Sequence, residues 1–274
     1  MESKLLNKKL IRMRKCTVFL LMIILSVAVA QGKKGDKQTT KTDNKVEPKT
    51  TPANPSTTSN PPSQPVQQDQ PANPLINHYL VKFNAAMRFS DADVARSALY
   101  DLIVENPAND SLFLNLAFMY YENQKYPSAI LVSQELMARN SRNTTAIELA
   151  ATSFEALNIY DKALQHYESL YLQTNAFPAL YKMAFLQFDL KRFKECSATS
   201  DILLSKKEAD ELKVSFPISD KQSKEFPIKV AVLNLKGMVA RESGDTAGAK
   251  KLFEQVLALA PDFVQAKENL AKLK

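Results

Sequence analysis

The sequence predicts an all-α fold: a solenoid of about five helix-turn-helix units with a C-terminal capping helix. Three alanines carry this prediction, because Ala95, Ala129 and Ala163 follow one another at intervals of 34 residues. A polar or aromatic cluster precedes each alanine, and apolar residues follow it three to four and seven positions later, which is the spacing of one helix face. A repeat of this length indicates helical pairs that bury their apolar faces by stacking on one another.

The small residues predict where the two helices of a pair approach each other closely. A larger side chain at such a crossing overpacks the interface and costs about 1–3 kcal/mol. Cys196 follows Ala163 by 33 residues, and a further alanine takes the same place after a longer interval. Packing therefore explains Cys196, and we expect no catalytic thiol. The expected repeat-packing small residues are Ala95, Ala129, Ala163, Cys196 and Ala249.

Turn and cap residues mark the ends of the helices. We expect Asp91 or Asp93, Ser111 and Asp161 to cap helices, because short polar side chains accept the free N–H groups of a first turn. Pro127 falls in a first turn, where its missing N–H does no harm. A final helix covers the end of the stack with its polar face outward. The units lie near 76–109, 110–143, 144–176, 177–204 and 230–263.

Residues 205–229 do not fit the period and form an insert. The motif Phe-Pro-Ile occurs twice in this part of the chain, at 216–218 and 226–228. Alternating apolar residues from Leu212 to Ile218 allow a strand or hairpin, but we favour an extended arm packed over the solenoid. Insertions in repeat proteins often lie on a binding face, so a functional role for the insert stays open.

The first 30 residues have the pattern of a secretory signal peptide. Six basic residues precede an apolar run that ends in the small-x-small sequence Ala28-Val29-Ala30. The run is shorter than the ~20 residues that a spanning helix needs. We expect export to the periplasm with cleavage between Ala30 and Gln31. The alternative is an uncleaved N-terminal segment that anchors the protein in the membrane, facing the periplasm.

The stretch 31–74 predicts a disordered linker rich in Pro, Thr and Gln, ahead of a repeat domain at 75–274. It holds eight of the 14 prolines and almost no large apolar side chains. Such a composition cannot bury enough surface to fold, and the prolines keep the chain extended.

The net charge of +7 belongs to the N-terminal part of the chain. Residues 1–74 carry 12 basic and 5 acidic side chains, whereas residues 75–274 carry 24 of each sign. Because nucleic-acid binding requires a basic surface, we expect no nucleic-acid partner. Membrane contact is expected only through an uncleaved leader.

Residue types that carry chemistry are sparse, so we expect no enzyme. The chain has two histidines, His78 and His166, and neither forms a metal-ligand spacing with another histidine or with a cysteine. No glycine-rich phosphate loop occurs. We therefore expect no catalytic residues, no metal and no cofactor.

The fifth unit resembles a tetratricopeptide repeat. The resemblance rests on residues that stand where that family has its glycine, turn, alanine, aromatic residue and proline: Gly237, Gly244-Asp245, Ala249, Phe253 and Pro261. The second unit is similar through Leu116, Ala117, Tyr120, Tyr126 and Ala129. The family's tryptophan is absent, and its place is taken by Tyr79, Phe113, Ile147, Leu180 and Leu233. The resemblance covers about 76–264 outside the insert. It implies antiparallel helical pairs in a right-handed superhelix whose concave face binds peptides or proteins.

The resemblance also implies which residues line that concave face. Family members that clamp a C-terminal carboxylate need cations where this chain has Leu80, Thr145 and Leu149, so no such clamp is expected. The aromatic residues instead suggest an apolar peptide or a partner helix, although several of them would serve equally to pack the solenoid. The expected groove residues are Leu80, Asn84, Asn115, Phe118, Tyr121, Tyr181, Phe185 and Phe188.

Leader, linker and repeats together predict a scaffold or adaptor of the bacterial cell envelope. In this hypothesis the concave face holds a protein or peptide whose identity the sequence does not give. The alternative is a structural subunit that associates with itself through its terminal repeats or its insert.

Overall fold

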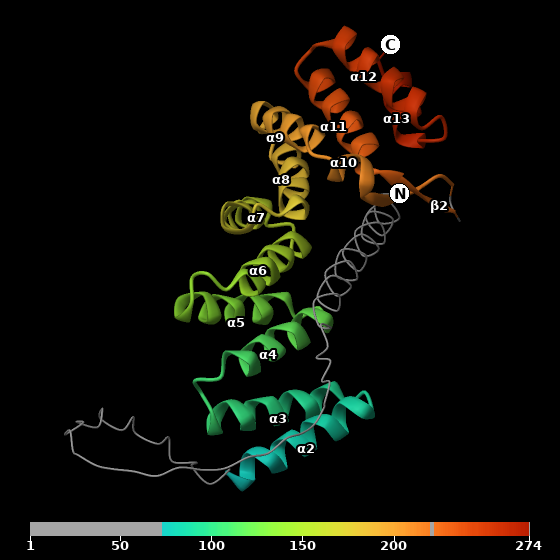
Figure 1. The fold of residues 1–274 in the computed structure, drawn as a ribbon. Helices are drawn as coiled ribbons and strands as arrows, with labels where there is room; N and C mark the ends of the chain where they lie inside the picture. The colour runs from blue at the N-terminus through green and yellow to red at the C-terminus, as the bar shows by residue number, and fades with distance from the viewer. Residues whose placement is uncertain (1–72, 220–221, 274) are drawn as a thin grey trace, which may run out of the picture.

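The computed structural model describes residues 73–219 and 222–273, which form a bowed stack of helical pairs (Figure 1). The expected signal peptide, its cleavage site between Ala30 and Gln31, and nearly all of the expected linker lie outside the described residues. The pairs are α2 (Pro74–Arg88) with α3 (Ala92–Glu105), α4 (Asp110–Glu122) with α5 (Tyr126–Arg139), α6 (Thr144–Ala156) with α7 (Tyr160–Thr174), α8 (Phe177–Asp189) with α9 (Phe193–Ser205), and α11 (Ile228–Glu242) with α12 (Thr246–Leu259).

A last helix, α13 (Val264–Ala271), covers the C-terminal end of the stack. Its Ala266 is buried against the α11–α12 pair, and Lys267 and Glu268 on the same helix are exposed. The predicted all-α solenoid with a C-terminal capping helix is therefore confirmed. No helix in the ranges described above is both long and apolar enough to cross a bilayer.

The five repeat-packing small residues all lie on the second helix of their pair, and each is 0% exposed. The closest approach occurs in the fifth pair, where α11 contributes Gly237. A Cβ atom added at Gly237 would lie 2.4 Å from the ring of Phe253 on α12, so only glycine lets these two helices meet. Small side chains thus set the distance between the helices of a pair.

The same tight turn joins the two helices of every pair. One residue of the turn has a positive φ, and the next backbone N–H donates to the carbonyl oxygen five residues before it, at 2.8–2.9 Å. This arrangement ends a helix sharply and satisfies its last carbonyls. The residues with positive φ are Ser90 (57°), Gln124 (60°), Asn158 (58°), Lys191 (58°) and Gly244 (85°). Only one of the five is a glycine, so four of these turns carry no obvious sequence signal.

The helix caps agree with only part of the prediction. Asp91 caps α3 through a 3.1 Å bond from the Val94 N–H, and Pro127 lies in the first turn of α5. Ser111 is wrong as a cap, because the preceding Asn109 caps α4 by accepting the Ser111 N–H. Asp161 is also wrong, because α7 begins at Tyr160 and has no side-chain cap. Both errors come from placing the helix start one or two residues late.

The insert forms a helical turn and a hairpin rather than the extended arm that we favoured. After α10 (Glu208–Glu211), β1 (Lys213–Pro217) pairs antiparallel with β2 (Ser223–Pro227). The strand alternative wins because alternate side chains can pack on the solenoid: Phe216 and Phe226 contact the Phe263 ring edge-on, at centroid distances of 5.0 and 5.1 Å.

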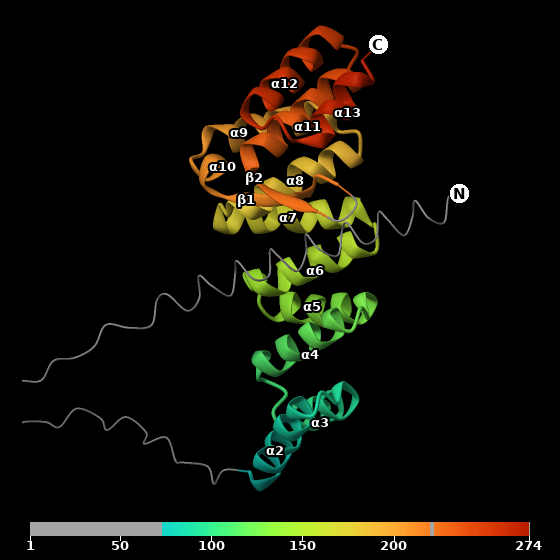
Figure 2. The ribbon, with the colours of Figure 1, turned by 90° about the vertical axis from the view of Figure 1, so that its right-hand side faces the viewer.

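The hairpin also holds the C-terminal end of the stack. The Lys224 ammonium lies 2.6 Å from the Asp262 carboxylate, and the Gln265 amide donates to the Pro217 carbonyl at 3.3 Å. Both strands contact α11 (Figure 2). The insert is therefore bound to the turn between α12 and α13 and closes this end of the stack.

Enlarging a buried small residue should destabilise the stack. We expect Ala129→Leu to lower the free energy of unfolding by about 1–3 kcal/mol, because the fully buried methyl leaves no room for a larger side chain. Ala138→Leu is the matched control, because Ala138 is exposed on the same helix. Urea unfolding followed by circular dichroism measures both, and equal midpoints for the two variants would contradict the packing role.

Candidate functional site

The first helices of the pairs line the concave side of the stack. In Figure 1, α4, α6, α8 and α11 lie along the inside of the bow, and α5, α7 and α9 lie along its outside. Consecutive inner helices touch, since α4 contacts α6 and α8 contacts α11. The concave face is therefore a continuous surface of inner helices.

The structure places the expected groove residues on three of these helices. Leu80 and Asn84 are exposed on α2, and Leu80 retains 40% of its accessible surface. Asn115 is exposed on α4. The aromatic members are all half-buried: Phe118 and Tyr121 on α4, and Tyr181, Phe185 and Phe188 on α8. None of the eight comes from α6, which lies between α4 and α8.

Contacts bring only some of these side chains together. The rings of Tyr181 and Phe185 lie 4.8 Å apart, one helical turn from each other. Tyr121 and Phe188 instead contact the first residue of the following outer helix, Tyr126 at 5.6 Å and Phe193 at 5.7 Å. The three aromatic residues of α8 also pack against the main core. The aromatic side chains thus combine a structural role with a partly open surface.

A polar bridge crosses the concave face between α6 and α8. The Lys182 ammonium lies 2.7 Å from Oε1 of Glu155, and the Tyr167 hydroxyl donates to Oε2 at 2.9 Å. The two charged side chains are only 13% and 17% exposed. Because each oxygen of the carboxylate has a partner, this burial is compensated.

The tyrosines next to this bridge stay neutral at physiological pH. Burial raises the pKa of Tyr121 to about 12, the neighbouring Tyr126 and Glu155 raise it further, and the Thr152 hydroxyl lowers it. Burial, with the nearby Glu155 and Glu148, raises the pKa of Tyr167 far above its ordinary range. Both phenols act as hydrogen-bonding groups rather than as acids or bases.

A second carboxylate of α6, Glu148, has no such partner. Its side chain is half-buried and lines a hollow of about 270 Å³ between α6, the end of α7 and the start of α8. Within the part of the chain that the structure describes, no hydrogen bond or ion pair reaches this carboxylate. Burial raises the pKa of Glu148 above the ordinary glutamate value. The hollow therefore contains an uncompensated negative charge.

Sequence reasoning missed Glu148 and Glu155, although the repeat frame contains them. Glu148 precedes Tyr181 by 33 residues and Glu155 precedes Phe188 by 33, so both stand in positions already assigned to the groove. The frame was read for aromatic residues, and α6 carries acidic residues at these places.

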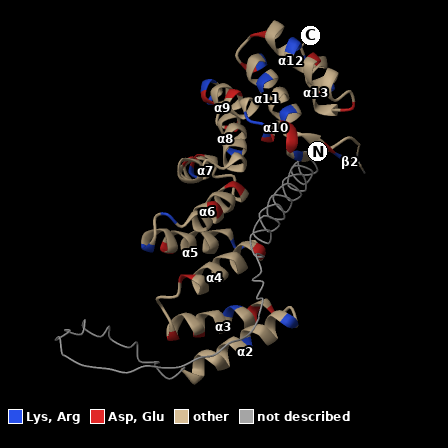
Figure 3. Cartoon of the chain, in the orientation of Figure 1, with Lys and Arg blue, Asp and Glu red and all other residues tan. Residues whose placement is uncertain are grey.

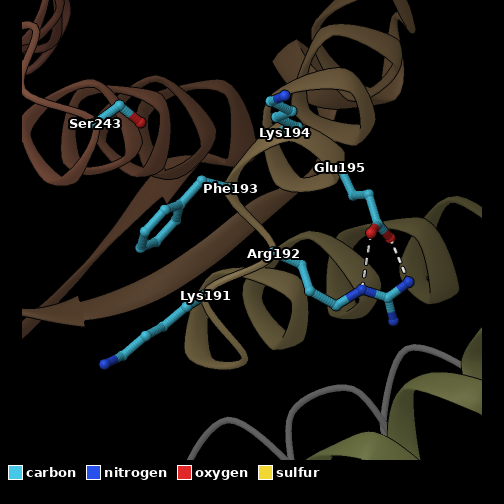
Figure 4. A pocket seen from close by; sticks show the side chains of 6 residues that line it. All are labelled: Lys191, Arg192, Phe193, Lys194, Glu195 and Ser243. Atoms are coloured by element: carbon cyan, nitrogen blue, oxygen red, sulfur yellow. Dashed lines mark hydrogen bonds and ion pairs between the residues drawn. The ribbon is translucent and has the colours of Figure 1, made fainter.

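A larger hollow, of about 430 Å³, lies at the turn between α8 and α9 and is lined in part by Ser243. Figure 4 shows that its side chains diverge: the Arg192 guanidinium turns to Glu195, with Nε 2.9 Å from Oε1, and Lys191 and Phe193 point elsewhere. No set of polar groups converges on one point there, so this hollow has no arrangement suited to a ligand.

Catalytic and metal-binding arrangements are absent from the described residues. No three His, Cys, Asp or Glu side chains among them gather in a way that could hold a metal ion. Cys196 is 0% exposed, and burial raises the pKa of its thiol to about 11, which keeps it protonated and unreactive. His166 stacks on Phe154 at 5.4 Å, and burial lowers its pKa.

Charge is spread evenly over the stack. In Figure 3, basic and acidic side chains alternate along the helices, and neither sign collects on one side in that view. Most ion pairs are exposed, such as Lys229 with Asp210 at 3.0 Å, and contribute little to stability.

Comparisons with known proteins agree with the resemblance read from the sequence. Residues 234–273 match the family model described as a tetratricopeptide repeat. Among similar solved structures is a tetratricopeptide repeat protein from Parabacteroides merdae, with 18% identity, a TM-score of 0.55 and 73% of each chain covered. No curated protein sequence matches the chain.

Two further solved structures have the same architecture. YrrB, described as a tetratricopeptide repeat protein with an unusual peptide-binding site, has 11% identity and a TM-score of 0.55 over 74% of this chain and 93% of its own. MamA from Desulfovibrio magneticus has 11% identity and a TM-score of 0.52 over 70% and 98%. At these identities the likeness establishes the fold alone.

Removing the Glu148 charge should stabilise the fold near neutral pH. A glutamate whose pKa is raised by folding binds its proton more tightly when folded, so its ionised form opposes folding above that pKa. We expect Glu148→Gln to raise Tm near neutral pH, and the difference from the parent chain to vanish below about pH 4, where both states are protonated. Thermal melts across this pH range measure the effect, with Glu268→Gln on the exposed face of α13 as the control. A lower Tm for Glu148→Gln at neutral pH would contradict the assignment.

Proposed function

We propose that this tetratricopeptide-repeat solenoid is a non-enzymatic scaffold or adaptor of the bacterial cell envelope, holding a peptide or partner helix on its concave face. The observation that carries the proposal is the set of half-buried aromatic side chains on α4 and α8, presented on one continuous surface. The absence of a catalytic or metal-binding cluster among the described residues is consistent with this proposal.

The chemistry of the surface favours a protein segment as the ligand. Aromatic side chains offer a large contact area at a small cost in conformational entropy. Tyr181 and Phe185 lie one helical turn apart, and Leu80 and Asn84 repeat this spacing on α2. Apolar contacts that are flanked by amide side chains suit an extended peptide or the apolar face of a helix.

The N-terminal sequence supports a location in the envelope. Basic residues followed by a short apolar run and Ala28-Val29-Ala30 are typical of a signal for export. In the proposed arrangement the protein is periplasmic, and the proline-rich stretch spaces the repeats from their point of attachment if the leader is retained. The partner is a protein or peptide, and the membrane is contacted only through that leader.

A structural subunit that associates with itself is the second candidate. It is favoured by the first helical pair, where large apolar side chains are exposed at an end of the stack that has no capping helix: Leu75, Val81, Met87, Phe89 and Val104. Light scattering at micromolar concentration separates the candidates, because a monomer would rule out the subunit.

Replacing the aromatic side chains of the groove should abolish partner capture. We expect a triple variant with Phe118→Ser, Tyr121→Ser and Phe188→Ser to lose the partner that cross-linking recovers from envelope fractions with the parent chain. Circular dichroism must show unchanged helicity, and the single variant Phe118→Ser should weaken capture if the triple variant unfolds. Leu131→Ser is the matched control, because Leu131 lies on the outer helix α5 and is 67% exposed. Undiminished capture by a folded triple variant rejects the groove.

Export with processing should leave a mature chain that begins at Gln31. We expect N-terminal sequencing of the protein from the periplasmic fraction to start at this residue, because the small side chains of Ala28 and Ala30 fit a signal-peptidase site. Recovery of residues 1–30 on a membrane-associated chain would favour the anchor instead. Recovery of the protein from the cytoplasm alone would reject export.

A further inference from the structure

The hollow at Glu148 has a shape and chemistry that differ from the rest of the concave face. It lies between two consecutive repeats, where α6 and α8 begin close to each other and α7 ends. Its wall combines the Glu148 carboxylate and the Thr145 hydroxyl with the apolar side chains of Leu170, Pro178 and Ala179. At about 270 Å³ it holds far more than one water molecule, which takes up about 30 Å³.

The charge in this hollow is unbalanced because the nearby cation is already engaged. Lys182 pairs with Glu155 at 2.7 Å, two helical turns along α6 from Glu148. The Tyr167 hydroxyl, whose ring also lines the hollow, donates to Glu155 as well. Of the two carboxylates on this face of α6, one is therefore satisfied and the other is left half-buried without a partner among the described residues.

We propose that this hollow receives a lysine or arginine side chain of the bound partner, whose positive charge pairs with the Glu148 carboxylate. The apolar stem of that side chain lies against Leu170, Pro178 and Ala179, and the Thr145 hydroxyl accepts a further hydrogen bond from its charged head. A long cationic side chain matches both parts of the wall, because it carries a charged tip on an apolar stem. This inference rests on the proposed function, because it names the chemistry of the segment held on the concave face.

The surroundings indicate the sequence context of this basic residue. Tyr181 occupies the repeat position of Glu148 on the next inner helix, and Phe185 lies beside it. A segment that inserts its basic side chain at Glu148 would therefore place neighbouring residues on these rings. The partner segment accordingly carries aliphatic or aromatic residues next to a lysine or arginine.

Other occupants fit less well. An anionic side chain or a free carboxylate would be repelled by Glu148. A metal ion would need further ligands, and no group of three ligating side chains occurs in the described ranges. A purely apolar side chain would leave the buried carboxylate uncompensated and would remove its remaining water.

The test uses short synthetic peptides as probes of the purified chain. The probe is acetyl-Leu-Lys-Phe-amide, and its matched control replaces lysine by norleucine, which keeps the stem and lacks the ammonium group. We expect the lysine peptide to shift the NMR signals of residues around the hollow in a saturable way, and to bind about tenfold or more tightly than the norleucine peptide, as a charge-assisted hydrogen bond implies. Glu148→Gln should remove this difference, and Glu268→Gln should preserve it.

Several outcomes overturn the inference. Equal binding of the two peptides does so, as does a preference for lysine that persists in Glu148→Gln or a lysine peptide that causes no saturable shift. Butylamine that binds as tightly as the lysine peptide would assign the hollow to free amines rather than to a partner segment. The melts of Glu148→Gln exclude unfolding as the cause of a loss.

The proposed function is tested separately. If the aromatic variant loses the captured partner and Glu148→Gln retains it fully, the groove stands and the role of the hollow fails. If capture survives both changes, the groove itself fails.

Discussion

The whole stack depends on one steric constraint: the two helices of each pair must approach closely at a position where the side chain is small. The five residues at these crossings have no accessible surface, and in the fifth pair Gly237 meets the face of Phe253 so closely that even a methyl group would not fit. The crossing orients each first helix, and repetition of the crossing aligns these helices along the concave side. The surface available to a partner is thus a consequence of packing inside each pair.

The sequence predicted this architecture well because the crossing leaves a periodic signal. Ala129 and its counterparts recur at fixed intervals among apolar residues, and no other common fold has that period. The turns were hidden, because Gln124 and Lys191 adopt positive φ without being glycines, held there by the helices on either side. The hairpin was underrated because its stability comes from Phe263, which is distant in the sequence. Local patterns do not record such contacts.

The candidate site was predicted less completely for a related reason. Aromatic side chains such as Phe118 and Tyr181 stand out in a sequence, whereas the meaning of a glutamate depends on its partners. Glu155 and Glu148 occupy equivalent surroundings on one helix face, yet Lys182 neutralises only the first. That distinction arises from the placement of α8 against α6 and has no counterpart in local composition. Charge balance at a partly buried site is a tertiary property.

The two ends of the stack differ, and this difference defines the open part of the concave face. At the C-terminal end α13 and the hairpin pack together, and Asn269 donates to Asn234 at 3.1 Å, so the inner helix α11 is covered there. At the other end α2 has no preceding repeat and exposes Leu80 and Val81. A ligand on the concave face therefore finds α2, α4, α6 and α8 accessible, with the unpaired carboxylate of α6 between two helices that carry aromatic side chains. Because the only uncompensated charge in this row lies at its centre, a bound segment would be positioned along the groove by that charge and held by the rings on either side.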